Sequence, residues 1–254
     1  MNIRPNFFII GAAKAATTSL SSMLSLHPEA GIVRGKEPHF FSYDHNFALG
    51  LAQYLQRYSH CAGKQAVGDA STSYSRIRYF PEAVGRIGRH FPDAKIIYMV
   101  RHPLQRMESA YVQHLGTPGG VVLLSINDAV RRQPMIVDSS RYWEVFDAYR
   151  KQFGETRIKI VWFEDYVANP GAVFGDVCRF LDIDDAVQLD FDRQERNSRA
   201  DAEKRLAAMN RQNLEIDTEW DSQTRQYVLD LIRDDTWRFL AHFGRQSDIW
   251  SDLF

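Results

Sequence analysis

Near the start of the chain, a lysine and a run of hydroxyl residues form the pattern of a phosphate-binding loop. Lys14 lies three positions after Gly11, and three hydroxyl-bearing residues follow it: Thr17, Thr18 and Ser19. Small residues, here Ala15 and Ala16, let the backbone approach a phosphate, and the first N–H groups of a helix beginning at Thr17 point towards it. A small-residue turn before a capped helix, with a solvated lysine, explains the same pattern.

A second candidate phosphate site lies about ninety residues further along. Arg101 follows a β-rich apolar run, and Ser109 comes eight residues later in a segment that begins with Pro103. An arginine at the end of a strand can form two hydrogen bonds to a phosphate, and a serine two helical turns later can add a hydroxyl donor. The alternatives are a surface charge for Arg101 and a hydroxyl bonded to its own helix for Ser109.

The elements that hold these residues alternate between short apolar runs and longer helical segments. Strands are predicted near residues 6–11, 65–68, 95–100 and 158–163. Helices are predicted from Thr17 to the residues before Pro28, from Leu51 to Tyr58, from Pro103, from Tyr142 to Phe153, and within 220–243. This alternation predicts an α/β fold with a central, mainly parallel sheet flanked by helices, built as a single domain over residues 1–254.

Composition excludes several classes of partner. The 254 residues carry a net charge of −1, which gives no support for binding to nucleic acid or to an anionic membrane. Neither the two cysteines nor the eight histidines show metal-ligand spacing, so no metal is expected. The apolar runs are too short to span a bilayer, no secretory leader is visible, and we expect a cytoplasmic protein. The oligomeric state is not predicted.

Together, the two phosphate motifs carry a family resemblance. Lys14-x-x-Thr17-Thr18-Ser19 and the block from Arg101 to Ser109 resemble the 5′- and 3′-phosphate motifs of sulfotransferases that use 3′-phosphoadenosine 5′-phosphosulfate (PAPS). Ala16 stands where that family commonly has glycine. The resemblance implies a P-loop-like three-layer fold and transfer of a sulfuryl group from PAPS, with adenosine 3′,5′-bisphosphate as product. It implies that residues 14–19, Arg101 and Ser109 bind the donor.

The acceptor side of the resemblance starts with a segment that reads Lys-Glu-Pro-His-Phe-Phe and is similar to one found in bacterial and heparan-type sulfotransferases. A hydroxyl nucleophile needs a base, and both Glu37 and His39 are candidates, with Glu37 favoured by the resemblance. Asp69 and Ser71 resemble residues that line the acceptor cleft, although a turn-capping aspartate is an alternative. Arg199 lies where many members of the family have a basic loop that folds over the nucleotide. The alternative is that Arg199 lies in the solvated, charged start of a helix.

These expectations leave the acceptor open. A carbohydrate or a small molecule with a hydroxyl or amine is compatible with the pattern. Two other functions also remain: a P-loop-type nucleotide kinase, and a catalytically silent nucleotide-binding protein. The kinase is disfavoured because the chain lacks the Gly-x-x-x-x-Gly-Lys-Ser/Thr spacing.

Overall fold

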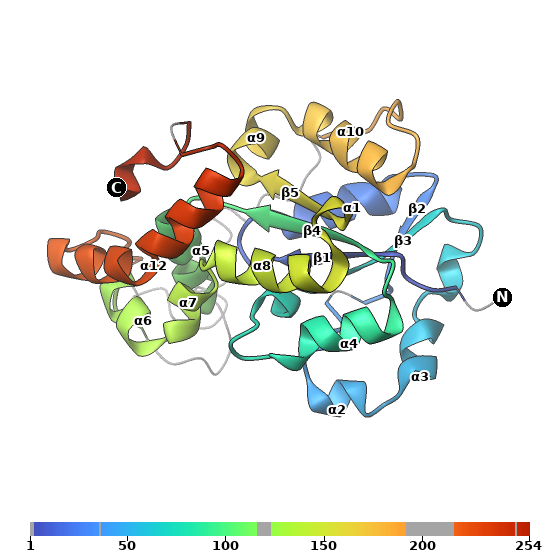
Figure 1. Cartoon of the computed structure of the whole chain (residues 1–254), viewed down its shortest axis with the longest axis horizontal. Coiled ribbons are helices and arrows are strands. Elements are labelled where there is room, and N and C mark those ends of the chain that lie inside the picture. The colour runs from blue at the N-terminus through green and yellow to red at the C-terminus, as the bar shows by residue number, and fades with distance from the viewer. Residues whose placement is uncertain (1–2, 36, 116–122, 192–215, 247) are drawn as a thin grey trace. The chain divides into compact units, whose positions relative to one another are not determined.

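A five-stranded sheet in the order β2-β3-β1-β4-β5 holds the centre of the fold (Figure 1). All four neighbouring pairs are parallel. The strands have the following bounds: β1 (Phe7–Gly11), β2 (Ala30–Ile32), β3 (Ala66–Ala70), β4 (Lys95–Val100) and β5 (Ile158–Trp162). The predicted α/β class with a parallel central sheet is therefore confirmed.

The structure is a computed structural model that describes residues 3–35, 37–115, 123–191, 216–246 and 248–254. The chain divides into two compact units. The first comprises Met1–Arg101 and Val145–Gln194 and contains the whole sheet, and the second comprises His102–Glu144 and Glu195–Phe254.

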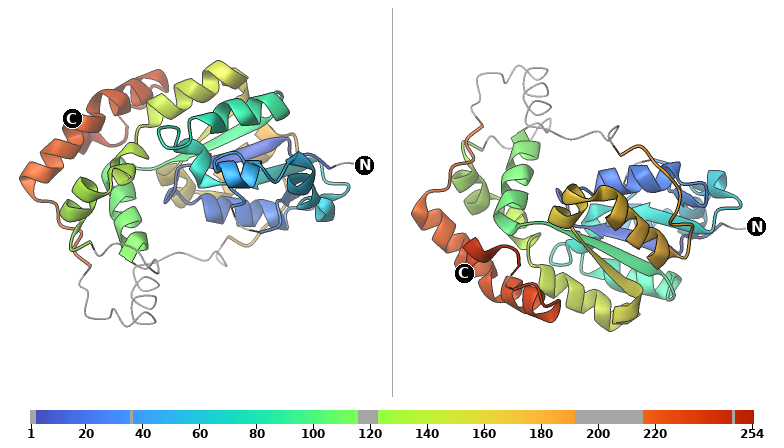
Figure 2. Two further views of the ribbon diagram at one scale, coloured as in Figure 1. Left: turned by 90° about the horizontal axis from the view of Figure 1, so that it is seen from below. Right: turned by 90° about the horizontal axis from the view of Figure 1, so that it is seen from above.

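Helices cover both faces of the sheet in the first unit. They have the following bounds: α1 (Thr17–Leu26), α2 (Asp44–Phe47), α3 (Leu51–Gln56), α4 (Glu82–His90), α8 (Tyr142–Phe153, most of it in this unit), α9 (Phe163–Ala168) and α10 (Pro170–Leu181). Figure 2 shows α1 and α10 on one face and α4 and α8 on the other. Right-handed crossovers place α1 opposite α4 and α8, because the chain moves from β1 towards β2 in one direction and from β3 towards β5 in the other. Helix α10 follows the last strand and is not part of a crossover.

The second unit is helical where the structure describes it. It contains α5 (Pro103–Leu115), α6 (Ile126–Arg132), α7 (Pro134–Asp138) and α12 (Ser222–His242). Side-chain caps fix two of these helices, because Ser125 accepts a hydrogen bond from the backbone of Asp128 and Asp221 accepts one from Thr224. Asp235 of α12 accepts hydrogen bonds from the backbone N–H groups of Trp143 (3.0 Å) and Glu144 (2.9 Å).

The core of the first unit explains why its strands form where the sequence is most apolar. All five residues of β1 and five of the six residues of β4 are buried, as expected for parallel strands covered on both faces. An aromatic cluster lies under β1, where the ring centroid of Phe8 is 5.9 Å from that of Phe41 and 5.6 Å from that of Phe91. These rings anchor the segment that follows β2 to the sheet.

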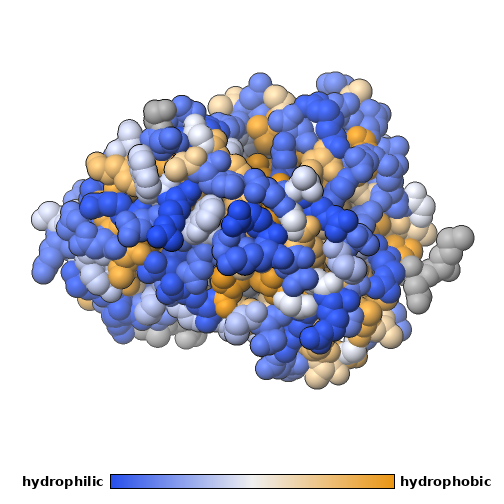
Figure 3. Space-filling model, in the orientation of Figure 1, coloured by the Kyte–Doolittle hydropathy of each residue, from blue (hydrophilic) through white to orange (hydrophobic). Residues whose placement is uncertain are grey.

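The surface is mostly polar on the face that Figure 3 shows, with apolar residues in small, separate patches. Among the described residues, none of the helices is both long enough and apolar enough to cross a membrane.

Candidate active site

The loop between β1 and α1 has the backbone conformation and the helix start that a phosphate-binding loop requires. At the end of β1, Gly11 has φ 145°, and a Cβ there would lie 2.2 Å from Oγ of Ser75, so only glycine fits. Helix α1 begins at Thr17, as predicted. Its N-cap, Ala16, has no side-chain hydrogen bond, and the first turn has no acidic residue. The helix N-terminus is thus left to accept an anion such as a phosphate.

Two non-glycine residues of this loop adopt the left-handed backbone conformation, Lys14 with φ 75° and Ala16 with φ 67°. Ala16 therefore has the conformation for which glycine is the favoured residue, at the position where the resembling family commonly has glycine. Left-handed non-glycine residues cost about 1–3 kcal/mol each and concentrate at functional sites.

Arg101 lies at the end of β4, the strand next to β1, and meets the phosphate loop there. Its Nη1 donates a hydrogen bond of 3.3 Å to the backbone oxygen of Lys14. Its guanidinium lies 4.3 Å from the ring centroid of Phe163, the first residue of α9. The stacked ring limits the orientations of the guanidinium. A second contact from α9 reaches the first turn of α1, where the hydroxyls of Ser19 and Tyr166 are 2.9 Å apart.

Glu37 and His39, the two candidate bases, lie side by side after β2. Nε2 of His39 is 3.4 Å from Oε2 of Glu37, and Oγ1 of Thr72 donates a hydrogen bond of 3.0 Å to the same oxygen. The other ring nitrogen of His39, Nδ1, is 2.7 Å from Oγ of Ser73. Both nitrogens of His39 thus have partners within the protein.

Local conformation and packing hold this pair in place. Both Glu37 and His39 have φ 51°, the left-handed region again. The next residues, Phe40 and Phe41, are buried, and Phe40 stacks on Tyr54 with ring centroids 4.4 Å apart. Burial lowers the pKa of His39, Glu37 opposes this decrease, and Arg76 adds to it. The neutral imidazole is therefore favoured at neutral pH.

Asp69 lies inside β3 and is fully buried, whereas the sequence places it after the strand on the wall of a cleft. Its carboxylate accepts hydrogen bonds from three hydroxyls: Tyr54 at 2.8 Å, Tyr74 at 2.7 Å and Ser71 at 2.7 Å. Burial raises the pKa of Asp69 to about 6, although these hydrogen bonds oppose the rise. Ser71, also fully buried, accepts a hydrogen bond of 3.1 Å from the backbone N–H of His39. Asp69 and Ser71 therefore lie beneath the candidate bases and position them.

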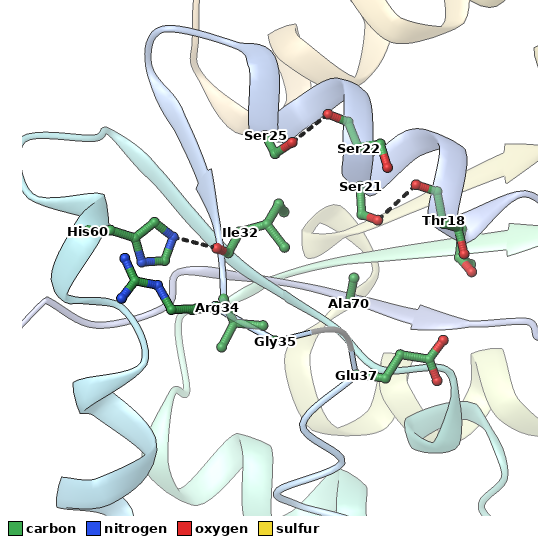
Figure 4. Close-up of a pocket in the computed structure, with 12 residues that line it drawn as sticks. Thr18, Ser21, Ser22, Ser25, Ile32, Arg34, Gly35, Glu37, His60 and Ala70 are labelled. Atoms are coloured by element: carbon green, nitrogen blue, oxygen red, sulfur yellow. Dashed lines mark hydrogen bonds between the residues drawn. The ribbon is translucent and has the colours of Figure 1, made fainter. Parts of the chain in front are cut away.

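A pocket of about 320 Å³ lies next to Glu37 (Figure 4). Residues along the length of α1 line it, among them Thr17, Thr18, Ser21 and Ser25. Glu37 and Ala70 also line it, as do Arg34 and His60, whereas His39, Asp69 and Ser71 do not. The candidate base Glu37 and the first residues of the phosphate-loop helix thus share one cavity.

The remaining residues of the predicted motifs belong to the second unit or fall outside the described residues. Ser109 is half-buried on α5, in the second unit, and Arg199 lies outside the described residues. Arg106 of the same motif is fully buried, where its Nε donates a hydrogen bond of 2.6 Å to Oγ of Ser140. Arg106 therefore packs the second unit. Among the residues that the structure describes, no cluster of histidine, cysteine, aspartate and glutamate has the form of a metal site.

Sequence reasoning missed several residues of this site. Thr72 holds Glu37, Phe163 holds Arg101, and Arg34 and His60 form one end of the pocket. The run of hydroxyl residues after Asp69 indicated the first of these. The others are separated in sequence from the residues that they meet, and local sequence does not reveal these contacts.

Comparison with known proteins places this geometry in a family. A model described as "Sulfotransferase family" matches residues 51–187, a segment that begins after the phosphate loop and Glu37. Heparan sulfate glucosamine 3-O-sulfotransferase 6 of Homo sapiens is 32% identical over 187 residues, which cover 70% of this chain and 52% of that protein. Heparan sulfate glucosamine 3-O-sulfotransferase 3B1 of Mus musculus is 37% identical over 186 residues, which cover 70% and 46%.

Solved structures agree with the sequence comparisons. The chain matches the crystal structure of a sulfotransferase from Alicyclobacillus acidocaldarius with a TM-score of 0.76 and 26% identity, over 98% of this chain and 99% of that one. The sulfotransferase domain of the Synechococcus PCC 7002 olefin synthase shares the fold, with a TM-score of 0.53 and 18% identity over 91% and 95%. The chain spans about half the length of the curated relatives that it matches. With the family model over more than half of its residues and this fold, the chain belongs to the sulfotransferase family.

Proposed function

We propose that the protein transfers a sulfuryl group from PAPS to a hydroxyl of a carbohydrate or small-molecule acceptor. Sulfuryl transfer, like phosphoryl transfer, needs an in-line nucleophile, stabilisation of the leaving phosphate and a base. The names of the curated relatives specify a glucosamine 3-O position, which supports a carbohydrate hydroxyl as the acceptor.

Residues of the phosphate loop and the end of β4 bind the donor in this proposal. The α1 N-terminus has no side-chain cap and no acidic residue in its first turn, which fits a 5′-phosphate bound by residues 15–19. Arg101 binds the 3′-phosphate, and a role for Ser109 in the same site stays a prediction from the sequence. When bound, PAPS supplies the sulfuryl group. Lys14 stabilises the negative charge that develops on the leaving phosphate oxygen as the sulfur–oxygen bond breaks.

Glu37 is the proposed base, and His39 positions it. Glu37 lines the pocket and His39 does not, and both ring nitrogens of His39 already have partners. Thr72 and His39 both face Oε2 of Glu37, which leaves Oε1 to take the proton of the acceptor hydroxyl. The observation that carries the proposal is that Glu37 shares one pocket with Thr17 and Thr18.

Calorimetric titration with adenosine 3′,5′-bisphosphate and, separately, with ATP–magnesium tests the donor site. We expect micromolar binding of the bisphosphate that is lost in Arg101→Ala and kept in Arg89→Ala, a change at an exposed arginine of α4. Preference for ATP–magnesium, with Arg101→Ala indifferent, would favour a nucleotide kinase. Tight bisphosphate binding without transfer to any acceptor would indicate a silent binding protein.

Single-turnover measurements separate the two bases. Glu37→Gln keeps the size of the side chain and removes its basicity, so we expect the transfer step to fall by at least 100-fold, within the usual range for a general base. His39→Gln should reduce transfer less, because it disturbs only the orientation of Glu37. The reverse order would assign the base to His39.

A further inference from the structure

The pocket next to Glu37 has two chemically different ends. Figure 4 shows Arg34 and His60 on one side, Glu37 on the other, and the serines of α1 along the wall between them. Arg34 follows β2, and His60 lies in the 3-10 helix Ser59–Cys61. A ligand that reaches Glu37 with one group can therefore present another group to Arg34.

The wall between the two ends accepts hydrogen bonds. Oγ of Ser21 donates to the backbone oxygen of Thr18 at 3.0 Å, and Oγ of Ser25 donates to that of Ser22 at 2.6 Å. Because these hydroxyl protons are directed to the helix, the serine oxygens offer lone pairs to the pocket. They suit a ligand that donates hydroxyl protons.

The end at Arg34 donates hydrogen bonds and is positively charged. Arg34 is exposed, and within the part of the chain that the structure describes no carboxylate forms an ion pair with it. By contrast, Arg86, Arg141 and Arg157 each pair with an aspartate. Nε2 of His60 donates to the backbone oxygen of Ile32 at 2.9 Å, since a carbonyl can only accept, so Nδ1 of the neutral ring is an acceptor and the donors at this end come from Arg34.

We propose that Arg34 determines acceptor specificity by binding an oxyanion of the acceptor, such as a carboxylate, while a hydroxyl of the same molecule meets Glu37. The planar guanidinium fits the two oxygens of such a group. That the bound oxyanion belongs to the acceptor rests on the proposed function. The binding of an oxyanion at Arg34 does not depend on it.

A pair of probes that differ in charge tests this inference without turnover. 4-Nitrophenyl β-D-glucuronide carries a carboxylate where 4-nitrophenyl β-D-glucoside carries a hydroxymethyl group. Each is titrated into the ¹⁵N-labelled full chain, and its dissociation constant is taken from amide shift changes. We expect the glucuronide to bind about tenfold more tightly, as for a hydrogen bond to a charged group.

Variants test whether Arg34 causes the preference for the glucuronide. Arg34→Ala should bind both probes equally, Arg34→Lys should keep part of the preference, and Arg89→Ala should keep all of it. Equal binding of both probes by the unmodified protein, no measurable binding of either, or a full preference in Arg34→Ala would overturn the inference. Titration of the same samples with adenosine 3′,5′-bisphosphate tests the proposed function separately, because Arg34 does not belong to the donor site.

Discussion

Oγ1 of Thr72 donates a hydrogen bond of 3.0 Å to Oε2 of Glu37, and this contact joins the candidate base to the 3-10 helix that follows β3. The two residues are 35 positions apart, and the pairing of β2 with β3 brings them together. The contact fixes one carboxylate oxygen and leaves the other to the pocket.

Replacing Thr72 tests this contact. Thr72→Val keeps the shape and removes the donor, so we expect kcat to fall about tenfold, the usual effect of losing a hydrogen bond to a charged group. Thr72→Ser keeps the donor and should retain most of the activity. The dissociation constant for adenosine 3′,5′-bisphosphate should be the same in all three proteins. Equal kcat for the valine and serine variants would show that the contact does not orient Glu37.

Lys14→Ala should reduce turnover more strongly than donor binding. If Lys14 stabilises the charge on the leaving oxygen, kcat should fall by more than about tenfold, which corresponds to 1.4 kcal/mol of barrier. Lys151→Ala changes an exposed lysine of α8 and serves as the matched control. Turnover measurements and calorimetric titration with adenosine 3′,5′-bisphosphate on the same preparations separate the effect on kcat from the effect on donor binding. A loss below tenfold would remove Lys14 from the proposed role.

Phe163→Leu should weaken donor binding through Arg101. The ring lies 4.3 Å from the guanidinium, and a cation–π contact of about 0.5–2 kcal/mol predicts a rise of about 2- to 30-fold in the dissociation constant for the bisphosphate. Phe180→Leu removes a similar contact with Lys95, at 5.6 Å, away from the phosphate loop. It should leave the bisphosphate affinity unchanged. Equal effects of both substitutions would indicate general destabilisation.

Asp69→Asn should flatten the dependence of stability on pH. Burial raises the pKa of Asp69 from 3.8 to about 6, so the folded state binds the proton more tightly than the unfolded state does. The stabilisation from this proton is complete below pH 3.8 and is lost as pH rises through about 6. At 1.36 kcal/mol per pKa unit, it amounts to about 3 kcal/mol.

Urea unfolding of both proteins from pH 4 to pH 8 measures this difference. Between pH 4 and pH 8, the free energy of unfolding of the variant should rise relative to that of the unmodified protein by about 2.4 kcal/mol, because part of the stabilisation is already lost at pH 4. Burial also raises the pKa of Asp235 to about 6, but that residue titrates in both proteins and cancels. Parallel curves would mean that Asp69 has an ordinary pKa.

Sequence predicts the framework of this fold well where apolar runs are long and helix starts are marked. The predicted run 95–100 is β4 residue for residue, and α1 and α5 begin at Thr17 and Pro103 as expected. The strand predicted for 158–163 ends one residue earlier, because Phe163 begins α9. β2, with only three residues, Ala-Gly-Ile, has no apolar pattern of its own, and it forms because β3 pairs with it.

The donor-side residues of the candidate site follow from sequence more readily than the contacts that orient the acceptor side. Lys14 and Arg101 are recognisable because the ends of two adjacent parallel strands display them. The burial of Asp69 is not recognisable from the sequence, because a carboxylate is seldom fully buried. Its partners Tyr54 and Tyr74 come from two different segments. Arg34 lines the pocket because of the path that the chain takes after β2, and no sequence motif marks that path.

The left-handed backbone of Lys14, Ala16, Glu37 and His39 also sets which residues each position tolerates. Glycine, asparagine and aspartate adopt this conformation readily, and valine, isoleucine and threonine do not. In a saturation library sorted only for the amount of folded protein, these four positions should therefore retain the first group and lose the second. A map of protein abundance, collected with no substrate at all, would then mark the two segments on which the proposed chemistry depends, together with Asp182 and Trp250, which share this conformation.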